Sequence, residues 1–234
     1  MSDHTLSAYD DELNELRSIV SRMGGLAGDQ LLGSMQALKE RDSEEAQRLR
    51  EADKELDRLE ALAEQTAIGV FARRAPVADD LREVVSALKM TTLIERMGDY
   101  AKNIAKRTLA ISESHPVVLP QTLETMAETA HRMIQDVMDA YAHRSADAAM
   151  DVWESDEVLD NMHNAAYRQI LARMMETPDY INVYTHYLMI AKNLERIGDQ
   201  ATNVAEQIYY TITGVVLEEA RPKGDTTSTE AVGQ

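Results

Sequence analysis

The 234-residue chain is acidic, with 41 Asp and Glu against 24 Lys and Arg and a formal net charge of −17. This charge argues against nonspecific binding to nucleic acid or anionic lipid, so no nucleic-acid partner is expected. The sequence has no cysteine, which excludes disulfides and thiolate metal sites and favours a reducing compartment. The polar first residues lack the pattern of a signal peptide, and no apolar run of about 18 residues exists to span a membrane. We therefore expect a cytoplasmic protein.

Apolar side chains at helical spacing predict three long helices in each half of the chain. In the first half they cover residues 7 to 40, about 44 to 74, and about 76 to 113, with Asp42 or Ser43 as a helix cap. A proline-containing linker follows, and helices are then expected over about 119 to 142, 147 to 176, and from 179 onward. Residues 221–234 are rich in Gly, Thr and Ser and are predicted to be a disordered tail.

An internal duplication organises this all-α chain. The stretch from Glu95 to Ala105 returns 100 positions later, from Glu195 to Ala205, with seven of eleven positions identical. Such a match inside one chain indicates a repeated structural unit. The predicted domains are residues 1–114, residues 115–220, and the tail.

Each copy carries a stripe of oxygen-bearing side chains at i, i+4 and i+8 on one helix face. The stripes are Glu95, Asp99 and Asn103 in the first copy, and Glu195, Asp199 and Asn203 in the second. If the face is partly buried, the carboxylates need a cation or a basic partner. Gly98 and Gly198 lie inside these helices at a cost of about 0.8–1 kcal/mol each against Ala, which suggests close approach of another backbone.

The preceding helix of each half adds a second acid pair, Asp53 with Asp57 and Asp156 with Asp160, related by an offset of 103. Asp53 and Asp57 precede the helix break by about as many residues as Glu95 and Asp99 follow it, so an antiparallel hairpin places them at similar height. All-oxygen ligands suit hard cations such as Mg²⁺, Mn²⁺, Ca²⁺ or oxidised iron. The sequence therefore predicts a carboxylate metal site in each half, formed with the amides of Asn103 and Asn203.

Two alternatives stay open at this point. A carboxylate-bridged di-iron oxidase or metal-storage bundle would use similar ligands, but the stripes lack the Glu-x-x-His pairs of ferritin-like sites. Only Asp160 and His163 have a related spacing, which keeps zinc in consideration. In the second alternative the acids form a solvated face, neutralised by nearby basic residues: Arg58, Lys89, Arg96, Lys102 or Arg196. No nucleotide-binding loop or nucleophile motif stands out, so no enzyme is expected.

The doubled Glu-Arg-[Met/Ile]-Gly-Asp-x-Ala-x-Asn motif, with the two Asp-x-x-Leu-Asp pairs, resembles the PhoU family over residues 4 to 213. The resemblance implies two tandem antiparallel three-helix bundles with six long helices, which often form a homodimer. It also implies metal clusters held by the paired acidic motifs. Family members often carry Asp two residues before the motif's Glu, where this chain has Leu93 and Asn193, so the number of ions stays open.

The resemblance further implies a non-enzymatic role in the cytoplasm as a negative regulator of the phosphate (Pho) regulon. In this role the protein is an adaptor that couples the phosphate ABC transporter to a sensor histidine kinase and controls phosphate uptake. It would meet the membrane only through these partners. The implied cofactors are divalent or trivalent ions: Mg, Mn, Fe or Zn.

Overall fold

The computed structural model describes residues 2–217, with side chains from residue 9 onward; the predicted disordered tail, 221–234, lies outside the described residues. The elements of the first half are α1 (Ser2–Glu40), α2 (Ser43–Ala52), α3 (Lys54–Arg74) and α4 (Ala78–Ser112). Those of the second half are α5 (Gln121–His143), α6 (Ala146–Glu154), α7 (Asp156–Glu176), the 3-10 turn η1 (Pro178–Tyr180) and α8 (Ile181–Thr213). No strand occurs within residues 2–217, which confirms the all-α prediction.

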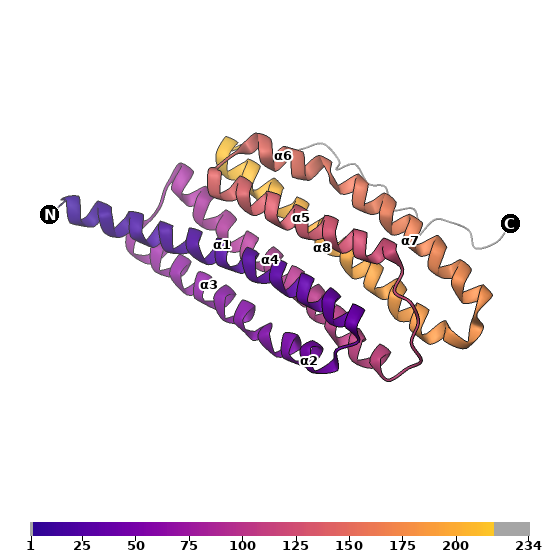
Figure 1. Ribbon diagram of the computed structural model, residues 1–234. Helices are drawn as coiled ribbons and strands as arrows, with labels where there is room; N and C mark the ends of the chain where they lie inside the picture. Colours follow the sequence, from indigo (N-terminus) through magenta and orange to yellow (C-terminus); the bar gives the residue numbers. More distant parts are fainter. Residues whose placement is uncertain (1, 218–234) are drawn as a thin grey trace.

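The helices form six long segments, because α2 continues into α3 and α6 into α7 after short interruptions. Figure 1 shows the segments running side by side, with α2 and α3 on one flank and α6 and α7 on the other. In the centre, α1 and α8 each pack against both α4 and α5. The two helices that carry the repeated motif, α4 and α8, therefore meet at the junction of the halves.

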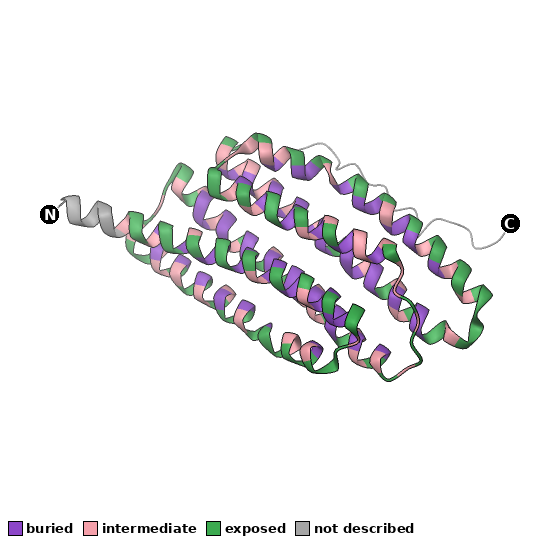
Figure 2. Cartoon of the chain, viewed as in Figure 1, coloured by how far each residue is buried: buried purple, intermediate pink, exposed green. Residues whose placement is uncertain are grey.

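One apolar core runs through both halves. It includes Leu31, Leu56 and Ile94 of the first half and Leu123, Leu159 and Leu194 of the second, all nearly inaccessible to solvent. Figure 2 shows the buried residues as stripes on the inward helix faces, while the outward faces are exposed. Met90, Met97, Met126 and Met133 are buried in this core, and Met138 and Met162 pack against it partly buried.

The turn after the first helix is repeated in the second half. Arg41 and Arg144 end α1 and α5 in left-handed conformations, with φ of 58° and 50°. Asp42 then caps α2 by accepting a hydrogen bond from the Glu45 amide at 2.9 Å, as predicted, and Ser145 caps α6 by accepting one from the Ala148 amide at 3.2 Å. The duplication thus extends to the local chemistry of the turns.

The sequence did not predict the interruptions at Asp53 and Ser155. Both residues keep right-handed helical backbone angles, so each segment continues in the same direction. Their effect is to start a new helix next to each second-helix acid pair. Asp57 lies in the first turn of α3 and Asp156 in the first turn of α7, where the helix dipole favours negative charge.

A search of the described helices for a segment long and apolar enough to cross a membrane finds none.

Candidate functional site: two carboxylate clusters

In the first half the acids of α3 and α4 come together, as their predicted equal height requires. Asp53 is buried, and its carboxylate accepts hydrogen bonds from Gln30 Nε2 at 3.3 Å and from Lys102 Nζ at 2.5 Å. Lys102 also contacts Asp99 Oδ1 at 2.7 Å. One ammonium therefore links the carboxylate of Asp53, at the interruption between α2 and α3, to a carboxylate of α4.

Negative charge exceeds positive charge in this first cluster. Burial and, in decreasing order, the nearby carboxylates of Asp99, Glu60, Asp57 and Asp53 together raise the pKa of Glu95 to about 7. Burial and Asp53 likewise raise the pKa of Asp57 above its ordinary value. The cluster therefore favours an added proton or an added cation.

The negative charge of this cluster also shifts the pKa of Lys102. Burial alone would lower its pKa, but its hydrogen bonds to Asp53 and Asp99 raise the pKa above its ordinary value. Of the five basic residues considered as neutralising partners, Lys102 is thus part of the first cluster. Arg58 instead pairs with Glu55 at 2.8 Å, and Arg196 lies over the Tyr100 ring, 5.7 Å from its centroid.

The acids of the second half are more deeply buried than those of the first. Asp156, Asp160 and Glu195 are 2%, 3% and 5% exposed, whereas Asp57 of the first cluster is exposed. Lys192 Nζ lies 2.7 Å from Glu195 Oε1 and supplies a positive charge. His163, one turn after Asp160, is 3% exposed, so this half also buries an imidazole on the same helix.

The two repeats supply their lysines from non-equivalent positions. Position 102 is Lys and its counterpart 202 is Thr, whereas position 92 is Thr and its counterpart 192 is Lys. The Thr92 hydroxyl donates to Glu60 at 2.7 Å, and the Thr202 hydroxyl donates to backbone carbonyls of its own helix. Each half thus keeps one ammonium against a predicted ligand carboxylate, although the lysine positions have diverged.

The repeated glycines allow a side chain, not a backbone, to approach, which corrects the sequence-based expectation. A Cβ at Gly98 would collide with Cδ1 of Leu56, and one at Gly198 would collide with Cδ2 of Leu159. These leucines are counterparts at the 103 offset. The missing Cβ lets α3 and α7 press a leucine against the motif helices and so holds the acid pairs at the same height.

The two asparagines lie away from the acids' closest contacts. Asn103 is exposed, and Asn203 lines a groove together with Leu88 and Lys89 of α4. The reason is geometric, because a spacing of four advances about 40° beyond one helical turn and a spacing of eight about 80°. A role of either amide in metal binding stays a prediction.

The donor chemistry suits a hard cation, while the present side-chain positions do not form a closed site. In the first cluster the candidate ligands that lie close together are carboxylates, and their charge exceeds that of Lys102. Among the described side chains, no group of three or more His, Asp or Glu residues stands ready to hold an ion. Binding would therefore require carboxylates to converge and, in the first half, Lys102 to give up its contacts.

Sequence reasoning overlooked several neighbours of the clusters. Gln30 reaches Asp53 from α1, and Glu60 adds to the field at Glu95. Neither carries a repeat signature, so only the packing of α1 and α3 against α4 reveals them. Trp153 makes a local contact, with its Nε1 donating to Glu206 Oε1 at 3.0 Å.

Two helical repeats whose motif-bearing helices, α4 and α8, pack against each other define the class of protein. The sequence model of the PhoU domain matches residues 20–108 and 123–208, so the chain belongs to the PhoU family, as the resemblance suggested.

Relatives match over nearly the whole chain. The phosphate-specific transport system accessory protein PhoU homologue of Caulobacter vibrioides is 43% identical over 97% of this chain and 100% of its own length. The homologue of Zymomonas mobilis is 44% identical, over 92% of this chain and 91% of its own. The crystal structure of PhoU from Pseudomonas aeruginosa has a TM-score of 0.84 at 32% identity, covering 88% of this chain and 100% of that one. That of the phosphate transport system regulatory protein PhoU from Streptococcus pneumoniae has a TM-score of 0.83 at 28% identity, covering 90% and 100%.

Proposed function

We propose that this protein is an accessory regulator of phosphate transport that keeps the phosphate regulon repressed when phosphate is plentiful. The observation that carries the proposal is membership of the PhoU family over nearly the full chain, with relatives named as accessory proteins of the phosphate-specific transport system.

The protein acts as a non-enzymatic adaptor in the cytoplasm. It couples the phosphate ABC transporter to a sensor histidine kinase, limits phosphate uptake and forms a homodimer. Its net charge of −17 supports contact with basic surfaces of such partners.

The carboxylate clusters bind metal ions in this proposal, with Mg, Mn, Fe or Zn as candidates. Asp53, Asp57, Glu95 and Asp99 would hold one site, and Asp156, Asp160, Glu195 and Asp199 the other. A bound ion supplies positive charge that relieves carboxylate repulsion. The chain's own lysines, Lys102 and Lys192, supply part of that charge without metal. Ion binding would therefore change the contacts between the outer helices and the central motif helices.

Deleting the gene tests the regulatory role. Alkaline phosphatase output should rise in cells grown in high phosphate, and the wild-type gene on a plasmid should restore repression. A chain with Asp57→Asn and Asp160→Asn should restore it less well if the clusters matter for regulation. Unchanged phosphatase output after deletion would contradict the regulatory role, whatever the clusters bind.

A further inference from the structure

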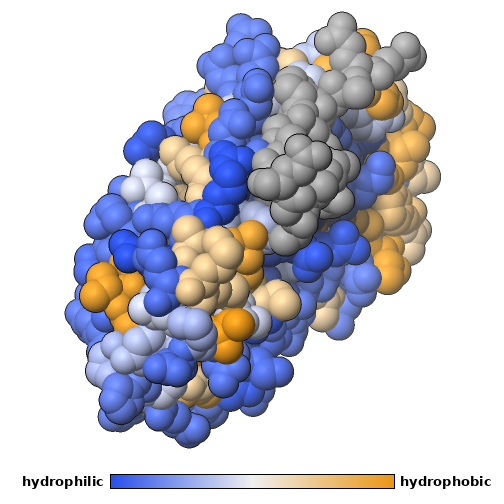
Figure 3. Space-filling model, turned by 90° about the vertical axis from the view of Figure 1, so that its right-hand side faces the viewer, coloured by the Kyte–Doolittle hydropathy of each residue, from blue (hydrophilic) through white to orange (hydrophobic). Residues whose placement is uncertain are grey.

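A cavity of about 380 Å³ opens at the junction of the two repeats, away from both carboxylate clusters. It lies where residues 14–21 of α1 meet the start of α4 and the ends of α5 and α8, at the N-terminal end of the molecule in Figure 1. Its volume is in the range of small-molecule sites. The opposite end of the molecule, which faces the viewer in Figure 3, shows separate apolar patches on a largely hydrophilic surface.

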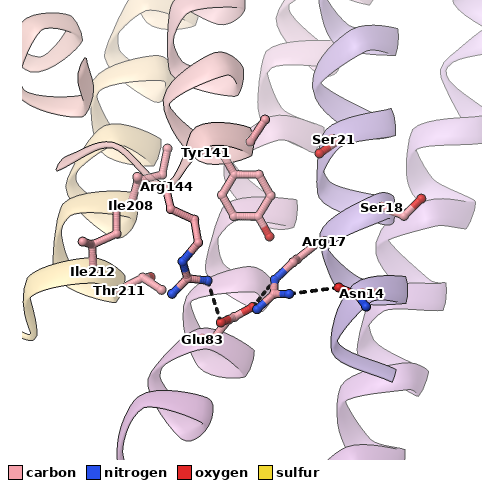
Figure 4. A pocket seen from close by; sticks show the side chains of 11 residues that line it. Asn14, Arg17, Ser18, Ser21, Glu83, Tyr141, Arg144, Ile208, Thr211 and Ile212 are labelled. Atoms are coloured by element: carbon pink, nitrogen blue, oxygen red, sulfur yellow. Dashed lines mark hydrogen bonds and ion pairs between the residues drawn. The ribbon is translucent and has the colours of Figure 1, made fainter. Parts of the chain in front are cut away.

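The polar wall of this junction cavity is rich in hydrogen-bond donors. Glu83, itself 8% exposed, is bonded by Arg17 Nε at 2.5 Å and by Arg144 Nη1 at 2.9 Å (Figure 4). Burial alone would raise the pKa of Glu83, but these hydrogen bonds hold it below its ordinary value, so the carboxylate stays ionised. Two guanidinium groups face this one carboxylate at the cavity wall, and the carboxylate of Asp10 also acts on Arg17.

Donors remain for a ligand. Arg144 bonds Glu83 through one of the five N–H groups that a guanidinium carries, and its side chain is 52% exposed. The phenol of Tyr141 stands beside the two arginines in Figure 4, and within the described side chains its buried hydroxyl has no hydrogen-bond partner. Burial raises the pKa of this phenol, so it stays protonated and able to donate. A buried hydroxyl without a partner is unfavourable, and an acceptor in the cavity would relieve that cost.

In the first repeat, an arginine closes the equivalent helix end. Arg41, the counterpart of Arg144, donates to the backbone carbonyls of Ile111 at 2.8 Å and Ser114 at 2.5 Å, at the end of α4. In the second repeat Arg144 turns to Glu83 instead, and the corresponding end of α8, with Ile208, Thr211 and Ile212, becomes an apolar wall of the cavity. The cavity therefore results from divergence between the repeats.

We propose that this junction cavity binds a compact organic anion, a carboxylate or a phosphate monoester with a short hydrocarbon group. Its oxygens accept hydrogen bonds from Arg144, Arg17 and Tyr141, and its hydrocarbon part packs against Ile208 and Ile212. Because Arg17 and Glu83 belong to the first repeat and the other residues to the second, the ligand joins the two repeats. The inference does not depend on the role in phosphate regulation.

Calorimetric titration of the full chain tests the assignment with butyrate, butyl phosphate, inorganic phosphate and butanol. At least one organic anion should bind saturably, and butanol should not. Tyr141→Phe should weaken binding of that anion at least tenfold while leaving the unfolding midpoint of the free protein unchanged or higher, because the substitution removes an unsatisfied hydroxyl. Arg144→Gln should weaken binding at least as much.

The matched control is Arg48→Gln, which removes the same charge from an exposed residue of α2 that pairs with Glu45. It should bind like wild type. If neither organic anion binds saturably, or if Tyr141→Phe binds the anion as tightly as wild type, the proposal is overturned. Inorganic phosphate binding as tightly as butyl phosphate would overturn the assignment to an organic ligand.

Discussion

Lys102 links the two acid pairs of the first cluster, through Asp53 and Asp99, without any metal. It therefore competes with any ion that the same carboxylates would bind. We predict that Lys102→Gln raises the affinity of chelator-treated protein for a divalent cation. Two unit charges about 4 Å apart interact by about 4 kcal/mol at an effective dielectric constant of 20. Because the Lys102 side chain is 35% exposed, solvent screening reduces this interaction energy to about a third. Removing the lysine should therefore raise the cation affinity roughly tenfold.

Lys106→Gln is the matched control for that titration. Lys106 is exposed one turn further along α4, and its substitution removes the same charge. If Lys102→Gln and Lys106→Gln change metal affinity equally, Lys102 does not compete at the cluster.

Gly98 and Gly198 make room for Leu56 and Leu159, which sets the spacing between helices. Gly98→Ala and Gly198→Ala should each lower the free energy of unfolding by about 1–3 kcal/mol through overpacking, although Ala is the better helix former. Gly25→Ala should act in the opposite direction and add up to about 1 kcal/mol, because nothing lies within 4 Å of a Cβ placed there. Urea denaturation measures all three, and equal stabilisation by all three would contradict this packing.

At the residue scale, the spacing of acids was a good guide in the first half of the chain. Asp53, Glu95 and Asp99 were found from spacing alone, and the structure places them in one cluster. Gln30 was not found, because its contact with Asp53 depends on how α1 packs. Duplication reveals what both halves share and gives no information about a partner present in one half.

The start of α4 is tied to both repeats by Glu83, which accepts from Arg17 of α1 and from Arg144 after α5. Its pKa in the fold lies below the ordinary value of 4.5, so the unfolded state takes up the proton first on acidification. This contribution to stability is complete above that value and is lost as the pH falls through the lower folded pKa.

We therefore predict that Glu83→Gln flattens the acid side of the stability profile. Between about pH 5 and pH 3 the wild-type protein should lose more unfolding free energy than the variant. Glu64→Gln, at an exposed position of α3, is the control and should follow wild type. A profile for Glu83→Gln parallel to wild type would show that the ion pairs contribute no pH-dependent stability.

At the element scale, apolar periodicity located all six long segments, and Asp42 was correctly placed as a cap. The interruptions at Asp53 and Ser155 escaped prediction, because neither site has the Gly or Pro that normally marks a break. Both residues keep helical backbone angles, so the amphipathic pattern passes through them unchanged.

One main apolar core joins the two repeats in the described part of the chain, and in it α1 and α8 each contact both α4 and α5. Although the sequence divides into two similar halves, we predict that they unfold together in a single cooperative transition. Fluorescence of Trp153 reports on the second repeat and circular dichroism on both, so the two urea curves should coincide. Two separate midpoints would show that the repeats are independent folding units.

At this scale the duplication did not predict the junction cavity. The cavity arises where the repeats differ, because Arg144 leaves the role that Arg41 keeps at the end of α4. A comparison of the two halves could align these arginines but could not show that their side chains turn to different partners.

The central structural claim is that the paired carboxylates are cation sites. The most direct measurement is the unfolding midpoint of chelator-stripped protein titrated with Mg²⁺, Mn²⁺, Zn²⁺ and iron, for wild type and for the Asp57→Asn/Asp160→Asn protein. An ion at about 100 times its dissociation constant should add roughly 2.7 kcal/mol per site. We predict a saturable rise in the wild-type midpoint with at least one ion and a much smaller rise in the variant. Equal responses, or none in either protein, would contradict the claim and leave the acids as salt-bridged helix faces.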